Sequence, residues 1–176
     1  KMRAVLVGIA GSNNAFSLSV YNLKAFAYND SETRKDWDIE VIQSPLIGLF
    51  KRDELLSDLT EKIALNEPNL VGFSCYMWNI EVVLKIAKKL RKRLPDLQIL
   101  IGGPEIATEY VQQSYFDKHA VDYCISGEGE LTFFELLQNL KRSKPALKNI
   151  PGLAYRSKKN MPFTVNTKRL PFKSLS

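Results

Sequence analysis

Apolar positions along this chain follow two periods, one typical of strands and the other typical of amphipathic helices. Mainly apolar runs at 3–9, 70–76 and 97–101 predict strands that are buried on both faces, as in a parallel sheet between helices. Residues 38–43 alternate between apolar and polar, which predicts a half-buried or edge strand. A fifth strand is expected at 121–126.

Apolar residues recur at helical spacing in the segments that separate these strands. Asn79 is a good N-cap residue for one of these helices. Helices are expected at 18–28, 55–63, 80–93, 107–116 and 131–140. Strands that alternate with helices of this length predict right-handed crossovers and a parallel sheet. We therefore expect an α/β fold, a flavodoxin-like three-layer sandwich with strand order 2-1-3-4-5.

The pattern changes near the C-terminus, at Pro151. Residues 152–156 and 163–166 flank a turn-like segment and predict a small hairpin. We therefore divide the chain into an α/β domain at 1–150 and a hairpin with a basic linker at 151–176.

Charge is distributed unevenly along the chain. The 176 residues carry a net charge of +6, and the segment 136–176 has many Lys and Arg residues but no Asp or Glu. A basic tail can bind nucleic acid, or it can be a solvated linker or a face that docks on another domain. Apolar residues such as Leu153, Tyr155 and Phe163 are unusual in a disordered arm. We therefore expect an ordered hairpin on the sheet edge, with its lysines facing outward.

The chain has no apolar run of the length that a membrane span requires, about 18–20 residues. Its first residues read as a strand rather than as a signal peptide. Cys75 and Cys124 both fall in or at the end of predicted buried strands, so no disulfide framework is expected. These observations predict a soluble cytoplasmic protein that does not bind membranes.

Small and polar residues end the third and fourth predicted strands. Ser74 ends one strand, and Gly102 and Gly103 end the next. In an open α/β sheet, the carboxyl ends of neighbouring parallel strands form the crevice where ligands bind. The Ser hydroxyl can donate and accept hydrogen bonds, and the glycines let ligand atoms approach the backbone. We expect a Val at either glycine to block this crevice and to leave the fold largely intact.

Two further segments are expected to line the crevice. Gly127–Glu130 reads as a tight turn into a helix, where its glutamates complement the positive helix N-terminus and its N–H groups can face a ligand. Tyr76, Met77 and Trp78 form an apolar shelf after the third strand. Such a shelf fits either core packing or a cover over a ligand or partner.

Several common classes of site lack their motifs here. There is no G-x-G-x-x-G between a strand and a helix, no G-x-x-x-x-G-K-[ST], and no Cys/His cluster with zinc-ligand spacing. The strand ends also lack the acidic residues of a phosphate-receiver domain. His119, the one histidine, precedes the fifth strand at the opposite edge of the sheet, and no histidine can activate Cys75 as a nucleophile. We expect no catalytic or metal-ligating residue in this chain.

The strand ends resemble those of a known family. Ser74, followed at the next strand end by Gly102 and Gly103, is similar to two signatures of cobalamin-binding domains, in which such residues line a channel for the nucleotide tail of cobalamin. Four segments in order make the resemblance more specific. They look like the N-terminal half of B12-binding radical S-adenosylmethionine enzymes such as the anaerobic magnesium-protoporphyrin ester cyclase, and they are VGFSCY (71–76), GGPE (102–105), GEGE (127–130) and GLAYR (152–156).

The resemblance implies cobalamin as the cofactor, without a protein ligand to cobalt from below. The D-x-H-x-x-G motif of methionine-synthase-type domains, whose His binds cobalt, is absent, because residues 11–16 read GSNNAF. The expected cofactor-binding residues are Ser12, Asn13, Ser74, Cys75, Tyr76, Trp78, Gly102, Gly103, Pro104, Gly127, Glu128 and Gly129.

The C-x-x-x-C-x-x-C motif of radical enzymes is absent as well, because the two cysteines lie far apart. The resemblance implies that this motif, with S-adenosylmethionine and a 4Fe-4S cluster, belongs to a C-terminal domain that follows a linker such as 170–173. We therefore expect a fragment that serves as the cobalamin-binding module and partner of its own radical domain, in methyl transfer or related radical chemistry on a small molecule. The alternative is a non-catalytic flavodoxin-like interaction domain whose basic tail binds nucleic acid.

Overall fold

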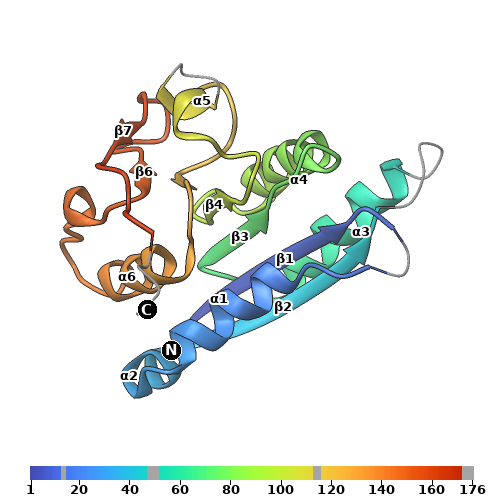
Figure 1. Cartoon of the computed structure of the whole chain (residues 1–176). Helices are drawn as coiled ribbons and strands as arrows, with labels where there is room; N and C mark the ends of the chain where they lie inside the picture. The colour runs from blue at the N-terminus through green and yellow to red at the C-terminus, as the bar shows by residue number, and fades with distance from the viewer. Residues whose placement is uncertain (13–14, 47–51, 113–115, 172–176) are drawn as a thin grey trace.

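One sheet of seven strands runs through the centre of the molecule (Figure 1). The computed structural model describes residues 1–12, 15–46, 52–112 and 116–171. The strands are β1 (Met2–Ala10), β2 (Trp37–Pro45), β3 (Leu70–Ser74), β4 (Gln98–Gly102), β5 (Tyr123–Ile125), β6 (Leu153–Tyr155) and β7 (Thr164–Val165). Their spatial order is β2-β1-β3-β4-β5-β6-β7, with β1 to β5 parallel and β6 and β7 antiparallel. The predicted parallel order 2-1-3-4-5 is confirmed.

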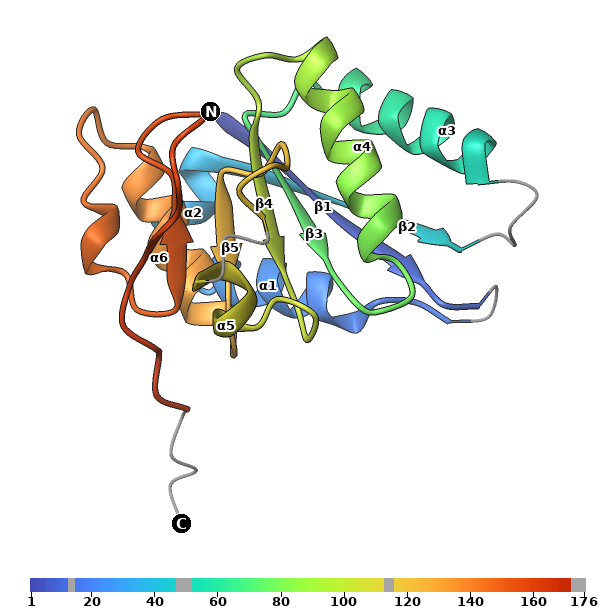
Figure 2. The ribbon, with the colours of Figure 1, turned by 90° about the horizontal axis from the view of Figure 1, so that it is seen from above.

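Helices cover both faces of this sheet (Figure 2). They are α1 (Leu18–Tyr28), α2 (Ser31–Asp36), α3 (Arg52–Leu65), α4 (Ile80–Arg93), α5 (Thr108–Gln112) and α6 (Glu130–Leu140), with a 3-10 turn η2 at Leu147–Asn149. Helices α3 and α4 form one layer, and α1 and α6 form the other (Figure 2). Within the described ranges, none of the helices is long and apolar enough to cross a membrane.

The structure contains one helix more than the sequence predicted. α2 was not expected. It begins after Asp30, whose carboxylate accepts hydrogen bonds from the backbone N–H and the hydroxyl of Thr33, both at 2.8 Å. The helix expected at 107–116 is described as the short α5, because 113–115 lie outside the described residues.

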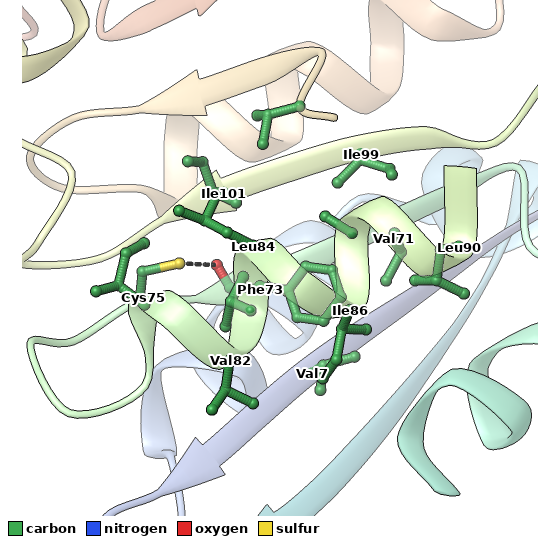
Figure 3. Packing of buried hydrophobic residues seen from close by; sticks show 14 of the residues in the cluster. Val7, Val71, Phe73, Cys75, Val82, Leu84, Ile86, Leu90, Ile99 and Ile101 are labelled. Atoms are coloured by element: carbon green, nitrogen blue, oxygen red, sulfur yellow. Dashed lines mark hydrogen bonds between the residues drawn. The ribbon is translucent and has the colours of Figure 1, made fainter. Parts of the chain in front are cut away.

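The alternation of side chains along β3 divides the core into two layers. Val71, Phe73 and Cys75 pack under α3 and α4 (Figure 3). Leu70, from the same strand, packs in the second layer under α1 and α6. The strand run is apolar on both faces because both faces are covered. It follows that Gly72 and Ser74 belong to the α1 and α6 side.

The predicted hairpin is present and extends the sheet. β6 pairs with β5 and β7 pairs with β6, both antiparallel. Arg156, at the end of β6, is only 9% exposed and stacks 4.4 Å from the centre of the Phe163 ring. Its Nη1 and Nη2 donate to the carbonyl oxygens of Phe116, Asp117, His119 and Met161 at 2.6–3.2 Å. One guanidinium thus ties the hairpin to the loop before β5.

Replacing Arg156 by Met should lower the free energy of unfolding by about 2–4 kcal/mol, because four carbonyl oxygens would lose their guanidinium donor. Those of Phe116 and His119 would keep a backbone N–H donor. Urea denaturation of the purified chain measures this loss. The control is Lys158→Met on the exposed turn of the hairpin, which should change stability by less than about 0.5 kcal/mol. Equal effects of the two substitutions would contradict the anchoring role of Arg156.

Candidate functional site

A cleft of about 710 Å³ opens at the carboxyl ends of the parallel strands, on the α1 and α6 side of the sheet. The register of the sheet places Ser74 opposite Gly102, and Gly102 opposite Ile125. The two strand ends that the sequence singled out are therefore neighbours. The cleft walls come from α1, from the loop after β4, and from the turn between β5 and α6.

Two glycines keep the floor of the cleft open. A Cβ at Gly72 would lie 2.9 Å from Cδ2 of Leu6 and 3.5 Å from Cδ2 of Leu100, so a larger residue there would displace the floor. A Cβ at Gly102 would meet only the Cβ and carbonyl oxygen of Ile125, both at 3.6 Å, which is ordinary contact. A side chain at Gly102 is therefore compatible with the fold but takes up space in the cleft.

A chain of three hydroxyls joins α1 to the end of β3. The Oγ of Ser19 lies 2.8 Å from the Oγ of Ser74 and 2.9 Å from the Oγ of Ser17. Gln43, on β2, fixes the position of Ser17, because its Nε2 donates to the Ser17 carbonyl at 2.7 Å and its Oε1 accepts from the Ser17 N–H at 3.0 Å. Ser19 and Ser74 both line the cleft. They supply hydroxyls that can donate and accept at an otherwise apolar wall.

Gly103 has a structural role that the sequence analysis did not assign. Its φ is +110°, and a Cβ there would lie 2.6 Å from the carbonyl oxygen and 2.9 Å from the nitrogen of Cys75. Only glycine fits this approach without moving the backbone. The expectation that Val at Gly103 leaves the fold intact is therefore wrong, and Gly102 is the position at which a steric test is clean.

The structure brings most of the expected residues together. Eight of them line the cleft, namely Ser74, Tyr76, Gly102, Gly103, Pro104, Gly127, Glu128 and Gly129. Trp78 is 46% exposed and stacks on Tyr76 with ring centres 4.6 Å apart, while Ser12 is exposed in the loop after β1. Asn13 lies outside the described residues. Cys75 is fully buried in the other layer, where its Sγ lies 3.8 Å from the Phe73 carbonyl oxygen (Figure 3).

Asn79 holds the polar end of β3 in place. It occupies the N-cap position of α4, as expected, but its side chain makes no cap hydrogen bond. Its Nδ2 donates to the carbonyl oxygens of Ile9 and Ser74, both at 3.0 Å, and its Oδ1 accepts from the Tyr76 N–H at 2.8 Å. This buried amide links the ends of β1 and β3 and fixes the start of the aromatic shelf.

His119 lies in the loop before β5, away from the cleft, as the sequence indicated. Burial, and the nearby charge of Arg156, lower the pKa of its imidazole. Among the residues that the structure describes, no group of three or more His, Cys, Asp or Glu side chains is placed to hold a metal ion.

The chain matches a known domain family over more than half of its length. A family model described as the B12 binding domain covers residues 33–137. The chain belongs to this family. The matched segment contains the carboxyl ends of β3, β4 and β5, and with them all eight of the cleft residues named above.

The relatives of this B12-binding domain are larger proteins. The chain is 29% identical over 150 residues to the cobalamin-dependent radical SAM methyltransferase TokK of Streptomyces tokunonensis, and this match covers 85% of the chain and 20% of that protein. An uncharacterized methyltransferase of Pyrococcus horikoshii is 32% identical over 133 residues, 74% of this chain and 27% of its own length. The anaerobic magnesium-protoporphyrin IX monomethyl ester cyclase of Synechocystis is 28% identical over 102 residues, 57% of this chain and 20% of its own length. The chain thus spans about a quarter or less of these relatives.

A solved structure shares the fold. The cobalamin-dependent S-adenosylmethionine radical enzyme OxsB superposes with a TM-score of 0.63 at 16% identity, over 96% of this chain and 22% of that one.

Ser19, Gly72 and Lys168 are among the residues that line the cleft of this B12-binding domain but were not predicted from the sequence. A lone glycine inside an apolar strand run is a signal of close approach, so Gly72 was open to prediction. Ser19 and Lys168 reach the cleft through contacts that span long stretches of the chain, and no local pattern marks them.

Neither cysteine of this B12-binding domain should react with a thiol reagent at pH 8 in the folded state, whereas both should react in denaturant. Burial raises the pKa of the Cys75 thiol, and burial together with Cys75 raises that of Cys124. The fold therefore favours the protonated thiols. Their contribution to the free energy of unfolding is fully present below the ordinary thiol pKa near 9 and is lost as the pH rises above that value. Rapid reaction of Cys75 in the native chain, identified by peptide mapping, would contradict its burial in the layer under α3 and α4.

Proposed function

We propose that this chain is the cobalamin-binding module of a larger radical S-adenosylmethionine enzyme, and that its cleft accepts the nucleotide tail of the cofactor. The observation that carries the proposal is the open cleft at the carboxyl ends of β3 and β4, in a chain of the B12-binding family. Its floor is made of Leu6, Gly72, Leu100 and Ile125, which suits a flat, weakly polar ring system.

The polar groups along the walls of the cleft suit the rest of such a tail. Ser19 and Ser74 can bond to the hydroxyls of a sugar, and Gly102 leaves room for it beside the strand end. The turn Gly127–Glu130 faces the same space. These residues fit the group in size and in chemistry, and they would hold it by packing and hydrogen bonds.

Exposed apolar residues follow the carboxyl ends of β1 and β3, beside the cleft. Phe16, Leu18 and Tyr21, on or just before α1, are 65%, 58% and 44% exposed, and Met77 and Trp78 are 79% and 46% exposed. Exposed apolar residues that gather at one edge mark an interaction site. We infer that the corrin ring and the remainder of the protein cover this edge.

Cobalt, when bound, supplies the methyl-carrying or electron-carrying centre of the chemistry. Residues 11–16 contain no histidine, and His119 lies at the other edge of the sheet, so we infer that no side chain of this chain ligates cobalt from below. S-adenosylmethionine and a 4Fe-4S cluster are assigned to the remainder of the protein, because the two cysteines here are buried. The comparisons and the ordered hairpin give no support to the alternative of a nucleic-acid arm.

The test is a titration of the 176-residue chain with hydroxocobalamin, followed by absorption spectroscopy. The wild-type chain should bind, and Gly102→Val should weaken binding by about tenfold or more, because the added methyl groups occupy the tail channel. A tenfold change corresponds to about 1.4 kcal/mol. Gly102→Ala should give a smaller effect, in proportion to its size.

Ser157→Val, which adds bulk to the exposed turn of the hairpin, is the matched control and should bind as the wild type does. Circular dichroism verifies that each variant is folded. Unchanged affinity of Gly102→Val would show that the ligand does not use this cleft. Absence of binding by the folded wild-type chain would contradict the proposed function itself.

A further inference from the structure

The segment that follows β7 returns along the sheet to the cleft. The Gly152 N–H donates to the Thr167 carbonyl oxygen at 2.8 Å. The Nδ2 of Asn166 donates to the carbonyl oxygens of Leu147 and Ile150 at 2.7 and 2.8 Å. These bonds hold residues 166–169, which we call the strap, against the turn that precedes β6.

Arg169 anchors the other end of the strap to α6. Its Nε donates to the Thr132 hydroxyl at 2.8 Å, and its Nη2 forms an ion pair with Glu135. The Thr132 hydroxyl in turn donates to the Pro151 carbonyl oxygen at 3.0 Å. The Arg169 side chain is 11% exposed, so this ion pair is largely shielded from water.

Gly152 makes room for this anchor. Its φ is +80°, and a Cβ there would lie 3.0 Å from Oγ1 of Thr132 and 3.4 Å from Cβ of Arg169. The close passage of the strap thus explains the glycine that begins the GLAYR segment. The strap is therefore built into the fold rather than laid loosely over it.

Between the two anchors the strap places Lys168 at the cleft. Lys168 lines the cleft and is solvent-exposed at its mouth. The other charged side chains among the described lining residues are Glu109, Glu128 and Glu130, so Lys168 is the single cation of that set. An anionic group that enters this cleft meets three carboxylates, and Lys168 is the lining side chain that can offset their repulsion.

We propose that the Lys168 ammonium binds the phosphodiester of the nucleotide tail, so that the strap selects corrinoids that carry this tail. This inference rests on the proposed function. A phosphodiester bears one negative charge, and hydrogen bonds between charged partners are shorter and stronger than neutral ones. The anchors at Thr167 and Arg169 hold the backbone of Lys168, which lowers the entropic cost of placing its side chain.

The experiment compares Lys168→Ala with the wild-type chain for two ligands, cobalamin and cobinamide. Cobinamide has the corrin ring but lacks the nucleotide base and its ribose phosphate. Lys168→Ala should weaken cobalamin binding by about tenfold and should change cobinamide binding by less than about twofold. Lys168→Arg, which keeps the charge, should retain most of the affinity for cobalamin.

Lys158→Ala is the matched control, because it removes the same charge from the exposed hairpin turn. Cobalamin affinity that is unchanged in Lys168→Ala, or lowered equally in Lys158→Ala, would overturn the role of Lys168 and leave the proposed function standing. Equal weakening for both ligands would also overturn it. If cobinamide binds too weakly to titrate, the contrast of Lys168→Ala with Lys168→Arg and Lys158→Ala decides the question. A wild-type chain that binds no cobalamin would overturn the inference together with the proposed function.

Discussion

The close approach of α1 to the ends of β1 and β3 is the constraint on which the rest of the site depends. A Cβ at Gly8 would lie 2.5 Å from the Cβ of Ser17, so only glycine lets the residue before α1 come this near to β1. The side chain of Gln43 fixes Ser17 through two hydrogen bonds to the Ser17 backbone. The hydrogen bond between the hydroxyls of Ser19 and Ser74 continues this connection to β3. Because the start of α1 is held at the strand ends, the glycine floor beside it stays open as a cleft.

The opposite wall of the cleft depends on the C-terminal segment. Arg156 ties the hairpin to the loop before β5, and Arg169 ties the strap to α6. These two residues supply positive charges of the basic tail, yet both point into the fold and bond to fixed acceptors. The tail is thus part of the structure that shapes the site. Some of its basic residues make structural contacts, and others, such as Lys158, are exposed to solvent.

The sequence predicted the fold well because apolar period and strand–helix order are local signals. It predicted the clustering of Ser74 and Gly102, since parallel strand ends meet at one edge. It placed Cys75 in the crevice, whereas the side chain is buried in the other layer, because a run that is apolar on both faces carries no signal of direction. It missed the helix after Asp30 although the N-cap was visible. The place of Lys168 depends on anchors that lie far away in the sequence, and local patterns carry no information about them.

The central claim is that the cleft at the carboxyl edge holds the tail of a corrinoid. Hydrogen–deuterium exchange of the chain, with and without cobalamin, tests it most directly. In α6 the first helical bond runs from the Phe133 N–H to the Gly129 carbonyl oxygen, so the amides of 130–132 have no acceptor within the helix and should exchange quickly when no ligand is bound. The account predicts that cobalamin slows exchange at 127–132, at 102–109 and at the start of α1. Protection confined to the loops around His119, at the amino ends of the parallel strands, would contradict the claim, and so would the absence of any protection.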